Sequence, residues 1–179
     1  MKRLALTRLI NNYSPTSSEE ILFKKKMLHF IESNPNCFER SLESGHITAS
    51  AFLLNKDHSE ALLMHHAKLD KWFQLGGHCD GDPNVLAVAI KEAQEESGIL
   101  GISPIHETIF DIDIHLIPAN KKEKEHFHYD VRFLLQVTSD EKVIQNRESK
   151  ELRWIEKNRD TIPTKSMSVV RMFQKWMNS

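Results

Sequence analysis

The sequence predicts a sandwich of helices around a sheet, of the α/β or the related α+β class. Four apolar or alternating runs have the two-residue period of β-strands: 46–55, 60–67, 109–118 and 126–137. Three runs have helical spacing or helix-start signals: 17–33, 82–98 and 166–178. Because strands surround one central helix and further helices flank the strands, we expect the two kinds of element to pack as layers around one core.

Length and composition limit the function classes. The chain has 179 residues, the usual size of one domain, so residues 1–179 are expected to form a single unit. A formal net charge of -1 gives no general attraction to nucleic acid or to an anionic membrane. Cys37 and Cys79 form no C-x-x-C pair, and the first residues resemble neither a signal peptide nor a membrane span. We therefore expect a cytoplasmic protein that binds neither nucleic acid nor a membrane.

The first predicted elements are a helix and a hairpin. Residues 17–33 open with serines and acids, place apolar side chains at helical intervals, and are followed by the helix-ending pair Asn34-Pro35. The apolar runs 46–55 and 60–67 are separated by the polar residues 56–59. Two short apolar runs with such a polar break are expected to pair as a β-hairpin.

The strands 109–118 and 126–137 alternate strictly, so each has two chemically distinct faces. The apolar face of the second strand is expected to lie in the core: Phe127, Tyr129, Val131, Phe133, Leu135 and Val137. Its other face carries His126, His128, Asp130 and Arg132. The first strand repeats the pattern, with Asp111, Asp113 and His115 on one side and Ile112, Ile114 and Leu116 on the other. The polar faces either line a substrate cleft or form a solvated outer face of the sheet.

The last elements are a short strand at 151–156 and a helix at 166–178. Ser166 is the expected cap of this helix. Its expected inner face consists of Val170, Phe173, Trp176 and Met177.

The segment 76–99 combines a glycine-rich loop with the central helix. Three glycines permit a tight loop that approaches a ligand closely: Gly76, Gly77 and Gly81. Asp82 is the expected N-cap of the helix, with Pro83 in its first turn. Gly98 is expected to end the helix.

The last turns of this helix carry three glutamates. Glu92, Glu95 and Glu96 are spaced i, i+3 and i+4, so their carboxylates project from one face. Each like-charged pair destabilises a helix by roughly 0.2–0.5 kcal/mol, and the C-terminal end of a helix favours cations. The cluster is either a solvated acidic face, with Lys91 paired to Glu95, or a metal site. The glycine loop beside it favours a site for Mg²⁺ or Mn²⁺, which prefer oxygen ligands.

This segment resembles the Nudix box: Gly, five residues, Glu, seven residues, Arg-Glu, an apolar residue, any residue, Glu-Glu, any residue, Gly and an apolar residue. The matching residues are Gly77, Glu92, Ala93, Glu95, Glu96, Gly98 and Ile99. Lys91 replaces the arginine, which keeps the charge but loses the planar fork of a guanidinium. Pro83 replaces the first glutamate, whose structural role would fall to Asp80 or Asp82.

The resemblance implies a Nudix-type α/β/α sandwich with a mixed sheet over 46–179 and a helical N-terminal extension over 1–45. It implies a hydrolase that uses Mg²⁺ or Mn²⁺ and water to split the pyrophosphate bond of a nucleoside diphosphate joined to another group, as in a nucleotide sugar or a dinucleotide. Glu92, Glu95 and Glu96 are then its catalytic metal ligands. Dimers are frequent in the family, so a homodimer is a further expectation.

Five residues are expected to contact the substrate: Gly77, His78, His128, Asp130 and Arg132. His78 follows the two glycines directly and is expected to face the phosphates, while Arg132 and the strand histidines would hold phosphate oxygens. The pattern H-x-H-x-D at 126–130 also suits zinc, because both imidazoles share a face of the strand.

Other side chains each have a functional and a structural interpretation. Glu148 and Glu151 are either a general base supplied by a loop or solvated acids. The side chains of His65 and His66 are either packed or solvated, or they act as ligands. Trp72 and Phe73 either stack on a nucleobase or pack in the core.

Two other function classes stay open on the sequence. Isopentenyl diphosphate isomerases share the Nudix fold and use a cysteine with a glutamate, and Cys79 lies in the glycine loop. Its surroundings, GGHCDG, do not match the isomerase cysteine motif, and a buried inert thiol is the simpler interpretation. A non-catalytic Nudix-like nucleotide sensor is the other alternative, which Lys91 and Pro83 keep open although the box glutamates are retained.

Overall fold

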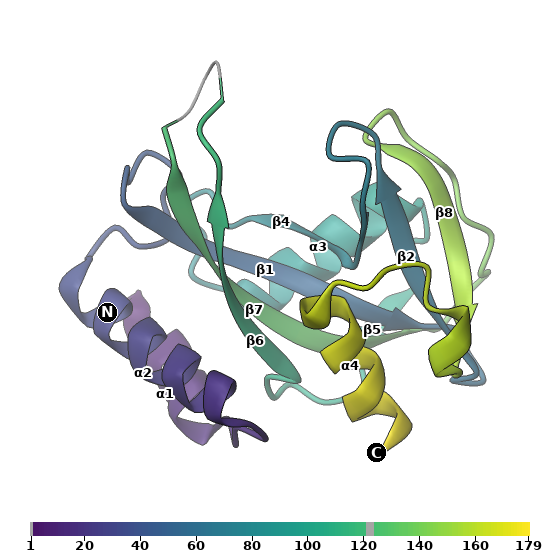
Figure 1. The fold of residues 1–179 in the computed structure, drawn as a ribbon, viewed down its shortest axis with the longest axis horizontal. Helices are drawn as coiled ribbons and strands as arrows, with labels where there is room; N and C mark the ends of the chain where they lie inside the picture. The colour runs from purple at the N-terminus through teal and green to yellow at the C-terminus, as the bar shows by residue number, and fades with distance from the viewer. Residues whose placement is uncertain (1, 121–123) are drawn as a thin grey trace.

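The predicted α/β architecture, with a mixed sheet between helices and a helical N-terminal segment, is present in the computed structural model, which describes residues 2–120 and 124–179 (Figure 1). In chain order the elements are α1 (Arg3–Asn12), α2 (Ser18–Ser33), β1 (Gly45–Leu54), β2 (Glu60–His66), β3 (Trp72–Phe73), β4 (Leu75–His78), α3 (Val85–Ser97), β5 (Ile102–Pro104), β6 (Asp111–Ile117), β7 (His126–Val137), β8 (Ser149–Glu156) and α4 (Met167–Met177). A single 3-10 turn, Arg159–Thr161, precedes α4.

Strand β1 is the centre of the sheet. It pairs in parallel with β7 and antiparallel with β2 and β4, while β5 and β6 pair antiparallel with β7. The expected hairpin of β1 and β2 forms, with Leu53 opposite Leu62. In the parallel pair His46 lies opposite His128 and Thr48 opposite Asp130. Paired residues share a face of a sheet, so this register places the polar side of β7 beside the even-numbered side chains of β1.

The helices cover the two faces of the sheet unequally. Residues of α3 and α2 share a buried cluster with the odd-numbered side chains of β1 and β7, and Phe30 stacks on Tyr129 with ring centroids 3.9 Å apart. On the other face α4 packs Phe173 and Trp176 against Phe52. Helix α4 covers only part of this second face, and the upper parts of β1, β6 and β7 lie beyond it (Figure 1).

The ends of the elements follow local rules with some differences. Ser17 caps α2 as expected, its hydroxyl accepting a bond from the Glu20 amide at 3.2 Å. Ser166 precedes α4 without a side-chain cap bond. Phe127, expected in the core, is 42% exposed because it lies at the outer end of β7, beyond the helices. Among residues 2–120 and 124–179, no helix is both long and apolar enough to cross a bilayer.

Candidate active site

The glycine loop and α3 form as predicted, except at the start of the helix. Asn84, not Asp82, is the N-cap: its side chain accepts a bond from the Ala87 amide at 3.2 Å, and α3 begins at Val85. Asp82 instead accepts a bond from the Asn84 amide at 2.8 Å, which closes the turn before the cap. Pro83 therefore lies in the turn before the helix rather than in its first turn. Gly98 ends α3 in the left-handed conformation, with φ of 74°, as expected.

The carboxylates of α3 pack against the backbone of β4. Glu96 is 5% exposed and accepts a hydrogen bond from the Gly76 amide at 2.8 Å. A Cβ on Gly77 would lie 2.3 Å from Oε2 of Glu92. Any larger residue at this position would displace the carboxylate, so the second glycine of the pair lets Glu92 lie against the backbone of β4.

Burial, with little compensation from a cation, determines the pKa values of Glu92 and Glu96. Burial raises the pKa of Glu96 to about 8, in spite of the Gly76 hydrogen bond, and the charges of Glu92, Glu148 and Glu95 raise it further. Burial also raises the pKa of Glu92. Within the described residues, Lys91 is a cation in contact with the cluster, with Nζ 3.7 Å from Glu92 and 3.6 Å from Glu95, but its side chain is 63% exposed. Such an exposed ammonium is screened by water and offsets little of the burial cost.

A fourth carboxylate, Glu148, approaches the same cluster from the loop before β8, since its charge acts on both Glu92 and Glu96. The loop is attached to α3 by Asn146, whose side-chain amide donates to the Glu95 carbonyl at 3.3 Å. The Glu148 amide donates in turn to the Asn146 side chain at 2.9 Å. Glu151, the other predicted base, instead pairs with Arg153 at 2.7 Å on the exposed side of β8.

His78 and His128 come together, but not at the glutamates. Successive β4 residues alternate sides, so Gly77 faces Glu92 while His78 faces away from α3. There it meets His46 of β1 and His128 of β7, with ring centroids 5.0 Å from each. Sequence analysis missed His46, because only the parallel register of β1 and β7 places it beside His128. Burial lowers the pKa of His128 to about 2, and the neighbouring imidazoles lower it further.

Asp130 and Arg132 lie inside the protein, neither in an open cleft nor on a solvated face. Arg132 is 1% exposed, and its guanidinium contacts Asp130 at 2.7 Å, Asp111 at 2.9 Å and Asp113 at 3.3 Å. It also donates to the Ser168 hydroxyl of α4 at 2.8 Å. A phosphate could reach this guanidinium only if those bonds were broken. We therefore assign Arg132 and Asp130 to the interior of the fold rather than to substrate contact.

The remaining candidates have partners within the protein. Trp72 stacks on His65, with ring centroids 4.9 Å apart, and the Arg153 guanidinium lies over its ring at 4.8 Å. The edge of Phe73 faces His66 at 6.4 Å. Cys79 is 3% exposed, and burial raises the pKa of its thiol well above the ordinary value.

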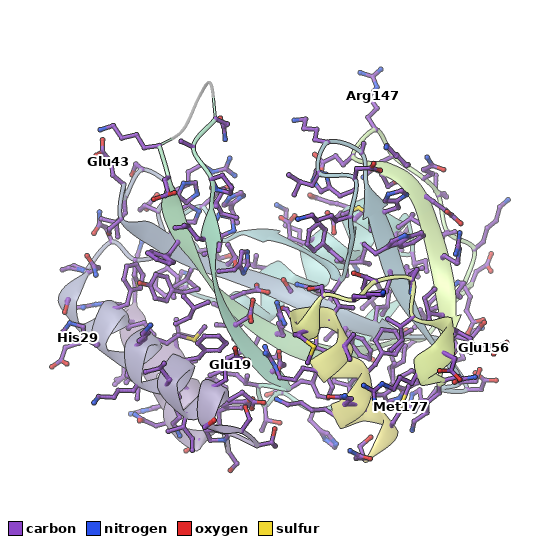
Figure 2. The ribbon with its side chains drawn as sticks, in the orientation of Figure 1. Glu19, His29, Glu43, Arg147, Glu156 and Met177 are labelled. Carbon is purple, nitrogen blue, oxygen red and sulfur yellow. The ribbon has the colours of Figure 1, made fainter. Side chains whose placement is uncertain are left out.

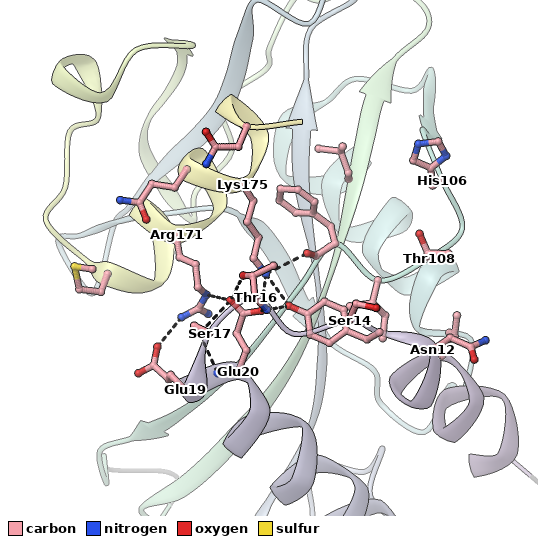
Figure 3. A pocket seen from close by; sticks show the side chains of 18 residues that line it. Asn12, Ser14, Thr16, Ser17, Glu19, Glu20, His106, Thr108, Arg171 and Lys175 are labelled. Atoms are coloured by element: carbon pink, nitrogen blue, oxygen red, sulfur yellow. Dashed lines mark hydrogen bonds and ion pairs between the residues drawn. The ribbon is translucent and has the colours of Figure 1, made fainter.

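The protein also has a cavity of about 930 Å³ where α4 meets α1 and α2 (Figure 3). Two of its lining side chains are cationic, but both already have anionic partners: Arg171 contacts Glu19 at 3.0 Å, and Lys175 contacts Glu20 at 2.9 Å. This cavity lacks the free charge that a charged substrate would need, so the glutamate cluster is the better candidate for a reaction centre.

Comparisons with known proteins agree with this geometry. The family model described as "NUDIX domain" matches residues 45–160. The fold is similar to an Ap4A hydrolase from C. elegans (TM-score 0.58, 18% identity, 74% of this chain and 95% of that one). It is also similar to a MutT protein from Methanosarcina mazei Go1 (TM-score 0.57, 19% identity, 76% and 96%).

A third similar structure is an ADP-ribose pyrophosphatase from Streptococcus suis 89-1591 (TM-score 0.53, 17% identity, 74% and 89%). A search of curated proteins found no match. The match of the family model spans most of the chain and contains the glycine loop, α3 and the loop that carries Glu148. The chain belongs to the Nudix family and is a Nudix hydrolase.

Proposed function

We propose that this hydrolase is divalent-metal-dependent and cleaves the pyrophosphate bond of a nucleoside diphosphate joined to another group, of the nucleotide-sugar or dinucleotide type. One observation carries the proposal: Glu96 is buried and Glu92 is partly buried against the glycine pair, and in the described part of the chain the cation in contact with the cluster is the exposed Lys91. Buried carboxylates are costly unless a positive charge joins them. A cation from solution would meet that need.

The residues present fit a hard divalent ion. Glu92, Glu95 and Glu96 offer only oxygen atoms, the ligands that Mg²⁺ and Mn²⁺ prefer. The bond from the Gly76 amide leaves the second oxygen of Glu96 available. When bound, such an ion lowers the pKa of water and neutralises charge that develops on phosphoryl oxygens.

The protein groups supply orientation and proton transfer. The Gly76 amide fixes the rotamer of Glu96, and the space over Gly77 lets the Glu92 carboxylate reach the strand. We assign Glu148 as the general base, because it is the carboxylate brought to the cluster by a separate loop. It would take a proton from the attacking water as the new P–O bond forms, while the bridging P–O bond breaks and the leaving phosphate departs with its electron pair.

The experiment that tests the proposal is a turnover screen. Purified protein is mixed with nucleotide sugars, dinucleotides, nucleoside triphosphates and isopentenyl diphosphate, each with Mg²⁺, Mn²⁺ or chelator. We expect metal-dependent release of a nucleoside monophosphate from one class, and loss of that release in Glu96→Gln. Nucleotide binding without turnover under every metal would support the sensor instead.

The isomerase alternative is tested by one variant. Cys79 is a buried thiol with a raised pKa, which disfavours a thiolate role. Turnover of the identified substrate should therefore survive Cys79→Ala. Isomerisation of isopentenyl diphosphate that disappears in this variant would overturn the hydrolase proposal.

Location and assembly are part of the same proposal. Cys37 and Cys79 are both free and buried, which supports a reducing compartment such as the cytoplasm. We also propose a homodimer, which light scattering of the purified chain would test. A monomer at all concentrations would remove that part of the proposal and leave the chemistry unaffected.

A further inference from the structure

Five histidines from four strands meet on the face of the sheet opposite α3. They are His46 of β1, His78 of β4, His115 of β6, and His126 and His128 of β7. The register brings them together, because His128 lies opposite His46 on one side and His115 on the other. Their ring centroids are 5.1 Å apart for His46 and His126, and 4.8 Å apart for His46 and His128.

Three of these side chains have the spacing of metal ligands. The ligand nitrogens of His46, His78 and His128 all lie within 4.8 Å of one another. Bonds of about 2.0–2.1 Å around a tetrahedral zinc ion place ligand nitrogens about 3.3–3.4 Å apart. Side-chain rotations that bring the three ligand nitrogens slightly closer together would therefore be enough to bind a zinc ion. Of these three ligands, His46 is buried with 1% exposure, and His78 and His128 are partly buried.

Neighbouring contacts already orient two further imidazoles. Nδ1 of His126 lies 2.8 Å from the Lys124 carbonyl, which only accepts, so this nitrogen carries the hydrogen and Nε2 keeps its lone pair in the neutral ring. That Nε2 lies 3.3 Å from Nε2 of His128. His115 contacts Asp113 through Nδ1 at 3.1 Å. Carbonyl and carboxylate partners of this kind orient imidazoles in known metal sites.

We propose that His46, His78 and His128 bind one transition-metal ion of the zinc class, with His126 beside His128 at the edge of the site. Imidazole nitrogens suit zinc and its neighbours, whereas Mg²⁺ prefers oxygen. An anion is the poorer occupant, because five imidazoles this close together repel one another when protonated. The site is distinct from the glutamates: Gly77 faces Glu92, and His78 projects from the opposite side of β4.

This assignment has a structural consequence. His78 is the last residue of β4 and the first after the glycine pair, so an ion held by it would join the start of the glycine loop to β1 and β7. The ion would act as a brace for the loop that supports the glutamates.

The test uses Co²⁺ as a spectroscopic substitute for zinc on the full chain, after treatment with chelator. We expect one equivalent of Co²⁺ to give the strong visible absorption of tetrahedral coordination, and one equivalent of Zn²⁺ to displace it. Glu96→Gln should leave this visible absorption, and its displacement by Zn²⁺, unchanged. His46→Ala and His78→Gln should weaken binding by more than the roughly 10–100-fold typical of losing an outer-shell partner.

The matched control is His29→Ala, because His29 is an exposed histidine of α2, far in sequence from the cluster (Figure 2). It should bind Co²⁺ like the original chain. Because His46 is buried, circular dichroism accompanies each titration, and His78→Gln provides the result if His46→Ala fails to fold. The proposal is overturned if the original chain binds no stoichiometric Co²⁺ or Zn²⁺. It is equally overturned if binding survives His78→Gln and disappears in Glu96→Gln.

Discussion

Two groups of buried acids in this protein have opposite electrostatics. The glutamate cluster of α3 has raised pKa values at Glu92 and Glu96. The second group, which we call the aspartate network, joins α2, β6, β7 and α4. It contains the acids Glu20, Asp111, Asp113 and Asp130 and the cations Arg132, Arg171 and Lys175.

Partners, not burial, account for the difference. Burial alone would raise the pKa of Glu20, but hydrogen bonds from Tyr13, Thr16 and Lys175 lower it to about 2. Burial of Asp113 is likewise outweighed by Arg132 and its neighbours, which hold its pKa well below the ordinary value. Glu96 instead has one backbone amide and three other carboxylates around it. Every acid of the aspartate network contacts a buried or nearly buried cation, whereas the cation at the glutamate cluster, Lys91, is exposed.

The comparison distinguishes charged groups that stabilise the fold from charged groups that are available for binding. The aspartate network contains its own cations and connects α4 to the sheet. Lys175 contacts Asp111 at 2.6 Å and Glu20 at 2.9 Å, and Figure 3 shows the contact with Glu20. At the glutamate cluster, burial and the neighbouring carboxylates instead raise the pKa values of Glu92 and Glu96, so the ionised forms are costly without a bound cation. A protein that retains such a cost, instead of neutralising it with a lysine or arginine, is expected to use it for binding.

The largest expected effect is on stability, from Arg132→Met. Removing this cation leaves Asp111, Asp113 and Asp130 facing one another in the interior. We expect the free energy of unfolding to fall by about 3–5 kcal/mol in denaturant titrations. Arg153→Met, on the exposed side of β8, is the control and should change it by less than about 1 kcal/mol. A stable Arg132→Met protein whose KM rises sharply would instead place Arg132 at the substrate.

The next effect is on catalysis, from Glu96→Gln. We expect kcat to fall by about 10²–10³-fold with the identified substrate, as for other groups that stabilise developing charge. The free energy of unfolding without metal should not fall, because the change removes a repelled carboxylate. Glu107→Gln, an exposed acid after β5, serves as the control. Unchanged turnover would show that the glutamate cluster is not the reaction centre.

Glu148→Gln tests whether the glutamate cluster extends to a separate loop. We expect kcat to fall by roughly 10²-fold and KM to change little, since a general base acts on the transition state. Glu151→Gln removes an acid that is paired with Arg153, so it should leave both constants unchanged. Equal losses in the two variants would contradict the assignment of Glu148.

The smallest effect is expected at Lys91, which replaces the arginine of the Nudix box. Its contacts of 3.6–3.7 Å to Glu95 and Glu92 lie at an exposed edge of the glutamate cluster. Lys91→Arg should therefore change kcat/KM by no more than about two- to five-fold. An increase of a hundredfold would mean that guanidinium geometry limits this enzyme.

The sequence predicted the features that depend on residues close together in the chain. Helix spacing, the glycine pair and Gly98 predicted where Glu92, Glu95 and Glu96 would lie relative to one another, because these residues are neighbours on one helix. Strand alternation likewise predicted that His128, Asp130 and Arg132 share a face. Local rules do not decide between Asp82 and Asn84 as the N-cap, because both residue types are good caps and the two positions lie only two residues apart.

Features that depend on contacts between distant segments of the chain could not be predicted from the sequence. Whether the polar face of β7 meets solvent, substrate or protein depends on α4, whose Ser168 hydroxyl binds Arg132. The parallel pairing of β1 with β7 joins residues about 80 positions apart, such as Ser50 and Asp130. No periodicity within either strand encodes that register. For the same reason His46 was missed, although His78 and His128 were both considered.

The central claim is that Glu96 is buried with no buried cation beside it among the described residues. Its most direct test is the unfolding free energy of the original chain and Glu96→Gln from pH 5 to pH 8.5, with and without Mg²⁺. A carboxyl group with a raised folded-state pKa contributes stability that is fully present below its unfolded pKa and is lost as pH rises through its folded pKa, here from 4.5 to about 8.

In this range the metal-free original chain should lose up to about 1.4 kcal/mol per pH unit relative to the variant. Mg²⁺ should restore that loss in the original chain and have little effect on the variant. Parallel pH profiles for the two proteins, or equal stabilisation of both by Mg²⁺, would contradict the claim.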